Sequence, residues 1–359
     1  MKTFIKTTFF ITFFLVSLVL TACSEKESET SMVVNIPRYS KVTAIENLDS
    51  SANVFKIENR GLYKIGVVED LNEMVYSIKN SVYAYSVNKS KGENFNNNSI
   101  IIIKDGKKKE LKGFYSALDL RLSPSGDKLA YRTFKKDSLD SAEGLKIYNI
   151  KDKKQMVLNS KVMVSGNLYW WLDSDRIMYY GAVEGKKNSD NIYVYDFTKN
   201  KEEIYLEDTK GYCMFLTPIN NSVFFLGREG DESRIYYYDI QSKETRSIDS
   251  NVEEIYKATA DLESGDIFFL GAEEDRQLAL YRFSSKSLKI DRLTYDFPKR
   301  LDLQSELALD DQGNIYFSGI ENEEVQDKKD VFMYDKKERA INLISTHEGK
   351  YNVYSSDRW

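Results

Sequence analysis

Few residues in this sequence could carry out covalent or metal chemistry. His347 is the only histidine, which argues against a Ser-His-Asp site and against a multi-histidine metal site. Cys213 lies in an apolar segment, and we expect it to be a small buried residue rather than a reactive thiol. Ser125 and Lys128 have the spacing of an activated serine, but they fall within a turn. No G-x-S-x-G elbow, P-loop or G-x-G-x-x-G motif occurs, and we expect no cofactor.

Two groups of residues are better candidates for ligand binding than for catalysis. Trp170 and Trp171 are adjacent in an expected strand, so they point to opposite faces, and only one is expected to join the core. The other would line a channel or the surface, where aromatic rings bind sugars and peptides. Glu273, Glu274 and Asp275 share one loop, without the spacing of a calcium loop. No metal site is therefore expected, and plain core packing and solvation remain the alternative readings of the two groups.

The elements that would position these residues are strands. Tyrosine and phenylalanine are abundant, with 25 and 19 residues, and proline is scarce with 4. Such a composition favours pleated, half-buried surfaces. No segment beyond the first 22 residues shows a sustained helical stripe of apolar residues. The sequence therefore predicts an all-β protein.

The strands recur with a regular order along the chain. Six aromatic-rich strands, each after a polar turn, start at residues 81, 128, 176, 222, 266 and 314. Each is followed by a charged loop, a second aromatic strand and a more polar outer strand. With the strand before each turn, every unit has four strands, and this spacing is typical of a β-propeller blade. A pair of β-sandwiches is the alternative, but it would not repeat one order six times.

The ends of the chain indicate a further blade. Strand-like segments start at Lys41, Asn53 and Gly61, and one more starts at Lys350. Three strands from the beginning and one from the end would complete a seventh sheet and remove the exposed edges of the ring. We therefore favour seven blades, with this 1+3 closure, over six blades with decorated ends.

One turn resembles a known family. In SPSGDKLAY, Ser123 to Tyr131, Pro124 presets φ and Gly126 supplies a positive φ, while Leu129 and Tyr131 share one face of the strand. This segment is similar to the repeat of TolB-like and dipeptidyl-peptidase-type propellers. The resemblance implies the architecture but little function, because one fold hosts many activities.

The N-terminus resembles a bacterial lipoprotein signal. Two lysines precede an apolar run that is shorter than a membrane span, and Leu20-Thr21-Ala22-Cys23 is similar to a lipobox. The resemblance implies cleavage before Cys23 and a diacylglyceryl thioether on its sulfur, with further acylation such as palmitate. We expect a signal peptide over 1–22, a lipidated and flexible tether over 23–39, and a single propeller domain over 40–359. An uncleaved anchor is the alternative.

Charge and cysteine content limit the partners. The net charge of −5 argues against nucleic acid, which binds concentrated basic patches. Beyond Cys23 only Cys213 remains, so no disulfide framework exists. In a propeller, loops between second and third strands share one face, and those between third and fourth strands share the other. The first set is rich in acids and the second in lysines, so we expect an electrically polarised disc.

These features predict a binding protein. We expect an extracytoplasmic lipoprotein, held to the cell membrane by its lipid anchor. It would act as a non-catalytic binding or scaffold propeller for a protein or polymer of the cell envelope. The alternative is a cell-envelope lyase or hydrolase with its site at the propeller channel. Carboxylates, tyrosines and arginines converging on the channel would favour that alternative.

Overall fold

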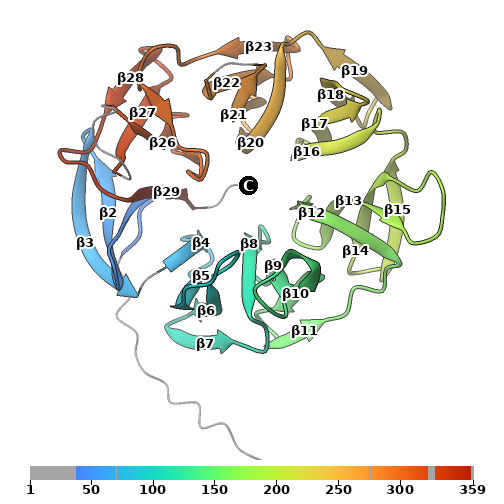
Figure 1. Cartoon of the computed structure of the whole chain (residues 1–359), viewed down its shortest axis with the longest axis horizontal. Helices are drawn as coiled ribbons and strands as arrows, with labels where there is room; N and C mark the ends of the chain where they lie inside the picture. The colour runs from blue at the N-terminus through green and yellow to red at the C-terminus, as the bar shows by residue number, and fades with distance from the viewer. Residues whose placement is uncertain (1–37, 70, 275–276, 322–327, 357–359) are drawn as a thin grey trace, which may run out of the picture. The chain divides into compact units, whose positions relative to one another are not determined.

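The protein is an all-β ring of seven sheets (Figure 1). The computed structural model describes residues 38–69, 71–274, 277–321 and 328–356, so Cys23 and Asp275 lie outside the described residues. Each sheet is antiparallel, with one edge strand near the ring axis and the other at the rim. The prediction of a seven-bladed propeller is confirmed.

Six blades use consecutive strands. The first three consist of β4 (Leu71–Ser77), β5 (Val82–Ser90), β6 (Asn97–Lys104) and β7 (Lys107–Leu111); β8 (Ser116–Leu122), β9 (Lys128–Phe134), β10 (Ala142–Asn149) and β11 (Lys154–Met156); and β12 (Val162–Trp171), β13 (Arg176–Val183), β14 (Asn191–Asp196) and β15 (Lys201–Leu206). The next three consist of β16 (Tyr212–Ile219), β17 (Ser222–Glu229), β18 (Glu232–Asp239) and β19 (Glu244–Ile248); β20 (Val252–Asp261), β21 (Asp266–Glu273), β22 (Ala279–Ser284) and β23 (Lys289–Arg292); and β24 (Arg300–Leu301), β25 (Ala308–Leu309), β26 (Ile315–Ile320), β27 (Asp330–Asp335) and β28 (Ala340–Leu343). A short 3₁₀ helix, η1 (Leu139–Ser141), lies between β9 and β10.

The seventh blade joins the two ends of the chain. Its strands are β29 (Tyr351–Ser355), β1 (Val42–Asn47), β2 (Ser51–Glu58) and β3 (Gly61–Glu69), with β29 innermost. β29 pairs with β1 from Val42–Ser355 to Glu46–Tyr351. This is the 1+3 closure that the sequence predicts, and it leaves β1 flanked by strands on both sides.

Side-chain contacts lock the closing blade to both neighbours. The Tyr76 hydroxyl of blade 1 donates to the Ser40 carbonyl at 2.8 Å, and the Ile78 amide donates to Ser356 Oγ at 2.9 Å. On the other side, Ser318 Oγ of blade 6 donates to the Tyr351 carbonyl at 2.9 Å. The ends are therefore held by hydrogen bonds as well as by the β29–β1 ladder.

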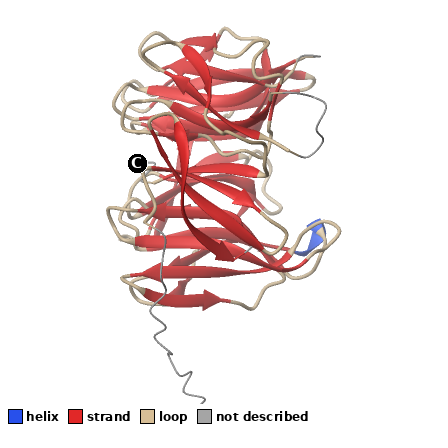
Figure 2. Ribbon diagram, turned by 90° about the vertical axis from the view of Figure 1, so that its left-hand side faces the viewer, coloured by secondary structure: helices blue, strands red, loops and turns tan. Residues whose placement is uncertain are grey.

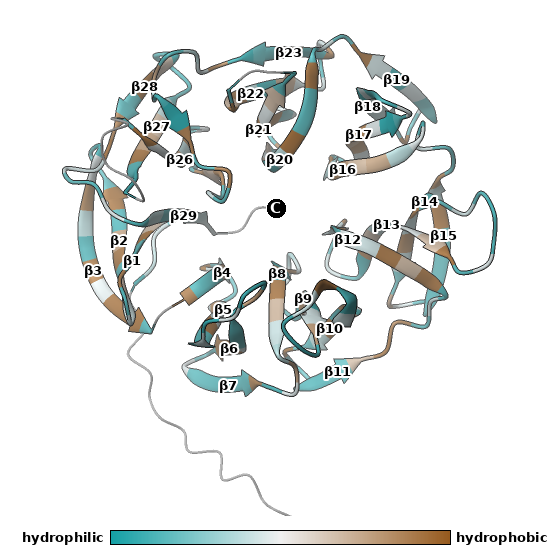
Figure 3. Ribbon diagram, in the orientation of Figure 1, coloured by the Kyte–Doolittle hydropathy of each residue, from teal (hydrophilic) through white to brown (hydrophobic). Residues whose placement is uncertain are grey.

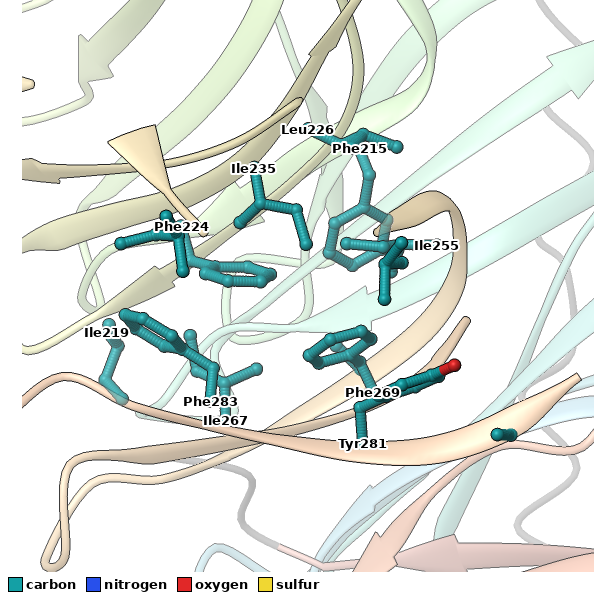
Figure 4. Packing of buried hydrophobic residues seen from close by; sticks show 14 residues of the cluster. Phe215, Ile219, Phe224, Leu226, Ile235, Ile255, Ile267, Phe269, Tyr281 and Phe283 are labelled. Carbon is teal, nitrogen blue, oxygen red and sulfur yellow. The ribbon is translucent and has the colours of Figure 1, made fainter. Parts of the chain in front are cut away.

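The core is divided among the gaps between blades. Strand alternation sends Phe224 of β17 towards blade 5, while Phe225 points towards blade 3. Between blades 4 and 5, Phe224 packs against Phe269 and Phe283 with ring centroids 5.5 and 4.8 Å apart (Figure 4). The outermost strands are more polar, as the hydrophilic colour over β7 and β23 shows (Figure 3). Most of the stabilising burial therefore lies between blades.

The two faces of the disc differ in what they carry. We call the side where β1 begins and β29 ends the terminal face; it also holds the turns between first and second strands and between third and fourth strands. The opposite side, the loop face, holds the loops between second and third strands and the connections between blades, and η1 lies on it (Figure 2). The lysine-rich turns do lie together on the terminal face. The same face also carries acidic turns of inner strands, among them Asp127, Glu263, Asp310 and Asp311. It is therefore not uniformly basic.

Candidate functional site

The inner strands depart from regular pairing near the loop face. Each of five inner strands shifts register against its neighbour within its first eight residues. The shifts fall between Leu71 and Glu73, Leu118 and Arg121, Val164 and Tyr169, Cys213 and Phe215, and Ile255 and Lys257. A bulge re-aims the side chains around it, and bulges are frequent beside functional sites. Here they surround the ring axis at one level.

A cavity of about 200 Å³ lies at that level. Its charged lining comes from four blades: Glu73 of β4, Asp119 and Arg121 of β8, Lys257 of β20, and Glu306. We call these five residues the channel cluster. Trp170, Met214 and Tyr256 supply apolar surface to the same cavity. The channel therefore joins charged and aromatic groups from strands far apart in the sequence.

Asp119 is held in a conformation that few residues adopt. Its φ is +59°, in the left-handed region that aspartate tolerates better than most residues. Its carboxylate accepts a hydrogen bond from Arg132 Nε, and Arg132 Nη2 lies 2.6 Å from the same oxygen. Its carbonyl accepts from the Tyr169 hydroxyl at 2.6 Å. These contacts fix the bulge of β8 and point its carboxylate at the channel.

Lys257 and Glu306 form an ion pair across two blades. The inner strand of blade 6 is interrupted between β24 and β25, and Glu306 comes from this interruption. Lys257 Nζ lies 2.5 Å from Glu306 Oε1. The negative charge of Glu306 is the largest influence on the ammonium and raises the pKa of Lys257. Lys257 therefore stays protonated in the channel despite its burial.

Glu73 has the most perturbed acidity in the cluster. Burial inside the ring raises the pKa of Glu73 to about 7, and the nearby charges of Asp119 and Glu306 act in the same direction. Lys257 and the backbone N–H of Leu120 oppose the shift. The side chain keeps some exposed area, because it borders the cavity itself. Glu73 can therefore change charge near neutral pH.

Arg121 and Trp170 stand where two cavities meet. The guanidinium carbon lies 3.5 Å from the Trp170 ring centroid, in cation–π contact. Both residues also line a second cavity of about 230 Å³ nearer the terminal face, together with Tyr76, Lys79 and Pro124. The Arg121–Trp170 pair thus forms a common wall of both cavities along the ring axis.

The two tryptophans do point to opposite faces, but both are buried. Trp171 is fully buried between blades 2 and 3, and its Nε1 donates to the Arg121 carbonyl at 2.9 Å. Trp170 packs between blades 3 and 4 while its edge lines the channel. The expectation that only one tryptophan joins the core is wrong. Long inner strands have a core on each side, so adjacent residues can both be buried.

The acidic residues predicted from the sequence lie elsewhere. Glu273 and Glu274 line a groove of about 510 Å³ between blades 5 and 6 on the loop face. Glu273 Oε1 accepts a hydrogen bond from the Tyr281 hydroxyl at 3.1 Å and lies 3.9 Å from Arg292 Nη1. Asp275 is outside the described residues. The groove and the channel share Tyr256, so the two hollows are neighbours.

The channel cluster was missed by sequence reasoning. Glu73, Asp119 and Lys257 sit in the inner strands, and charged residues are common throughout this chain. One signal was present for two of them: Glu73 and Asp119 each stand among apolar residues in a short strand. Aligning the first strands of the blades, rather than the second, would have brought these charges to one level.

The other side chains that could react chemically are buried or contact neighbouring side chains. Cys213 is buried, and burial raises the pKa of its thiol well above the usual value. His347 is exposed, with its Nε2 3.0 Å from the Tyr351 hydroxyl. Lys128 Nζ donates to Asp175 at 2.7 Å rather than approaching Ser125. Within the described residues, no group of three or more His, Cys, Asp or Glu side chains could hold a metal ion, and no helix is long and apolar enough to span a membrane.

Comparisons with known proteins connect the chain to propellers by fold. No family model matches the sequence, and no curated protein does either. The propeller domain of the trilobed protease from Pyrococcus furiosus aligns with a TM-score of 0.56 at 12% identity, covering 85% of this chain and 95% of that one. Dipeptidyl peptidase 4 from Porphyromonas gingivalis aligns with a TM-score of 0.53 at 13% identity, covering 88% of this chain.

The chain spans about half of that dipeptidyl peptidase, 53% of its length. TolB from Acinetobacter baumannii aligns with a TM-score of 0.49 at 12% identity, covering 87% of this chain and 82% of that one. At such identities a likeness shows the fold alone. The seven sheets and the alignments with the Pyrococcus and Porphyromonas propellers confirm the fold expected from the SPSGDKLAY turn. The Pyrococcus domain is described as having an open velcro topology, whereas β29 closes the seventh blade here.

Proposed function

We propose that this protein is a membrane-tethered propeller that binds a protein or polymer of the cell envelope without changing it chemically. The observation that carries the proposal is that the chain enters the ring on one face while the channel cluster lies towards the other. The chain enters the ring at the terminal face, while the channel cluster and the groove beside it lie towards the loop face. A tether on the terminal face leaves the channel cluster and the groove open to a partner from the opposite side, although the terminal face has hollows of its own, of about 720 and 230 Å³.

The tether is the segment between Cys23 and Arg38. A lipid on Cys23 would hold the protein at a membrane, because two acyl chains anchor far more firmly than one. Fifteen residues of extended chain reach at most about 50 Å. The ring would then sit close to the bilayer with its terminal face inward. The lysines of that face, such as Lys107 and Lys337, would be attracted to anionic headgroups by on the order of 1 kcal/mol each.

The channel cluster supports binding because most of its charges are already engaged. Asp119 is held by Arg132, Glu306 by Lys257, and Arg121 rests on Trp170. Groups fixed before a ligand arrives cost little ordering on binding. Rigid strands rather than loops carry all of them except Glu306. Such preorganisation suits recognition of one shape and charge pattern.

Anchoring is tested on the full chain in bacterial cells. Cys23→Ala should abolish incorporation of labelled palmitate and release the protein from the membrane fraction. Orientation is tested with single cysteines, since the buried Cys213 should give little background. A membrane-impermeant maleimide should label Glu184→Cys on the loop face faster than Lys337→Cys on the terminal face. Normal membrane fractionation of Cys23→Ala, or equal labelling of both faces, would count against the proposal.

Binding without turnover needs a separate measurement. The lipidated protein in detergent micelles is titrated with envelope glycans and with peptides, and each ligand is recovered for mass spectrometry. A bound ligand should return unchanged. Glu73→Gln should alter its affinity, whereas Glu184→Gln, an exposed acid on the same face, should not. If the whole panel fails to bind, the binding function is wrong.

A second candidate function is favoured by one observation. A carboxyl with a pKa near 7, beside the carboxylates of Asp119 and Glu306, has the acidity of a general acid or base. The channel could then act as a hydrolase or lyase. Products recovered from the titration, with a rate that depends on pH around 7 and is lost in Glu73→Gln, would select this candidate.

A further inference from the structure

Exposed apolar side chains gather beside the channel on the loop face. Tyr212, Met214, Tyr256 and Leu303 are 51, 43, 37 and 46% exposed, although all belong to or flank inner strands. We call them the mouth residues. Met214 and Tyr256 line the channel cavity, and Tyr256 and Leu303 line the neighbouring groove. Single exposed apolar residues are ordinary, but Met214, Tyr256 and Leu303 line two adjoining hollows, which indicates a contact surface. Tyr212 lies at a separate hollow between blades 3 and 4.

The charge beside the mouth residues is negative. Among the described residues that line the groove, one is a cation, Arg300, and four are glutamates: Glu253, Glu254, Glu273 and Glu274. In the channel, three carboxylates face Arg121 and Lys257, and Arg132 pairs with Asp119 from beside the cavity, so the acidic excess lies in the groove. Low-dielectric walls concentrate such a field in a hollow. A cation approaching the loop face is therefore attracted to the groove, which adjoins the channel at Tyr256.

The size of the cavity limits what can enter. At about 200 Å³ it is smaller than the pockets of 300 to 1,000 Å³ that hold drug-sized ligands. A lysine or arginine side chain has an apolar stem and a charged head. Its stem would pass Met214 and Tyr256, and its head would reach Glu73. One long cationic side chain fits both the lining and the dimensions.

We infer that the channel receives a lysine or arginine side chain of a polypeptide, whose neighbouring apolar residues rest on the mouth residues. This inference rests on the proposed binding function and specifies its ligand. A polypeptide explains the surface better than a free amine, because a small amine would use the cavity alone. The mouth residues and the acidic groove extend the contact over blades 4, 5 and 6, which is the reach of several residues of extended chain.

The test uses the full, lipidated chain in detergent micelles and isothermal titration calorimetry. The probes are the capped pentapeptide Gly-Phe-Lys-Phe-Gly, its arginine, norleucine and glutamate versions, and n-butylamine. The lysine and arginine peptides should bind at least tenfold more tightly than the norleucine peptide at low salt. This preference should shrink as salt rises to 0.5 M, about 4 Å of screening length. Butylamine alone should bind at least tenfold more weakly than the lysine peptide.

Two variants separate the channel from the rest of the face. Glu73→Gln should remove most of the preference for lysine over norleucine, and the matched control Glu184→Gln should leave it intact. Met214→Lys, which places a cation at the cavity of an otherwise unchanged ring, should weaken the lysine peptide at least tenfold. Thermal unfolding of each variant confirms that it folds.

The outcomes distinguish the inference from the proposed function. Equal binding of the lysine and norleucine peptides, tight binding of butylamine alone, or indifference to Glu73→Gln overturns the inference. If an envelope glycan binds while the cationic peptides do not, the binding function stands and the polypeptide ligand is wrong. If no peptide and no glycan binds, both fail.

Discussion

The gap between blades 4 and 5 and the channel at the ring axis are built by the same inner strand, β20, in opposite ways. In the gap, Ile255 and Ala258 pack with Phe224, Phe269 and Phe283, all of them buried hydrophobic residues. At the channel, Lys257 of the same strand meets Glu306, Glu73 and Asp119. Both register shifts of the strand lie before Lys257, and its pairing is regular from Lys257 to Asp261.

The comparison shows which of the two regions stabilises the fold and which one destabilises it. Apolar burial between blades stabilises the ring by about 25 cal/mol for each Å² removed from water. Burying a carboxyl in a hollow beside like charges opposes folding, and for this reason the pKa of Glu73 is raised. A region that lowers the stability of the fold, and whose side chains are nonetheless held in place by specific contacts, is a candidate functional site. Removing the Glu73 carboxyl from the channel should therefore stabilise the fold, whereas truncating a side chain in the gap should destabilise it.

The largest effect is expected from removing the closing strand. Deleting residues 351–359 takes β29 away, so β1 becomes an exposed edge and the buried side chains of Tyr351, Val353 and Tyr354 leave two cores. The protein should lose more than about 5 kcal/mol and aggregate, since each large buried side chain contributes about 2 kcal/mol or more. Soluble yield and thermal unfolding measure the outcome. An unchanged melting temperature would contradict the 1+3 closure.

The second-largest loss of stability is expected from a substitution in the core. Phe269→Ala removes a fully buried ring that contacts Phe224 and Tyr281, and it should cost about 3–5 kcal/mol. Tyr295→Ala, an aromatic truncation at a side chain that is 66% exposed, is the matched control and should change stability by less than about 0.5 kcal/mol. Urea unfolding at pH 7 gives both values. Similar losses in the two variants would mean that the inter-blade core is not the main source of stability.

Glu73→Gln should instead stabilise the ring, and only at higher pH. A carboxyl whose pKa rises from 4.5 to about 7 on folding binds its proton more tightly in the folded state. Its cost is absent below pH 4.5, grows as the pH rises through that interval, and is complete above pH 7. Glutamine cannot ionise, so the variant should gain up to about 3 kcal/mol at pH 8 and almost nothing at pH 4. A gain that does not depend on pH would show that the acidity of Glu73 is unperturbed.

The smallest effects concern ion pairs. Lys257→Met leaves Glu306 beside Glu73 and Asp119 without its cation, and it should cost about 2 kcal/mol at pH 7, because a partly buried charge loses its partner. Arg234→Met breaks an exposed pair with Glu232 and should lower stability much less than Lys257→Met. Urea unfolding of both variants compares the channel with the rim. Equal costs would mean that the channel is as well solvated as the surface.

The sequence sufficed for the architecture because the fold repeats. Every strand start counted from the turns, including Ser222 and Asp266, lies within a blade of the structure. Turn chemistry is also local: at Gly126, φ is +68°, and a Cβ there would lie 2.8 Å from Asn80 Cβ. The 1+3 closure followed from the strand-like character of both ends. These features depend on residue type and spacing, which the sequence displays directly.

The site could not be predicted in the same way. Glu73 and Glu306 are more than 200 residues apart, and only the curvature of the ring brings them near each other. Bulges set the side on which Asp119 emerges, and a single residue of shift reverses it. Glu273 and Glu274 were noticed because they are consecutive, yet they line the groove rather than the channel. Residues that meet only at the ring axis share no pattern in the local sequence around each of them.

The position of β1 in the closing blade has a mechanical consequence. A pull on the segment before Arg38 acts along the axis of β1, which is hydrogen-bonded to β2 on one side and to β29 on the other. Both ladders run across the direction of that pull, so they are sheared together rather than opened one bond at a time. Drag on the N-terminal segment is thus borne by two ladders at once. The blade that closes the ring would also resist any force applied through the N-terminal segment.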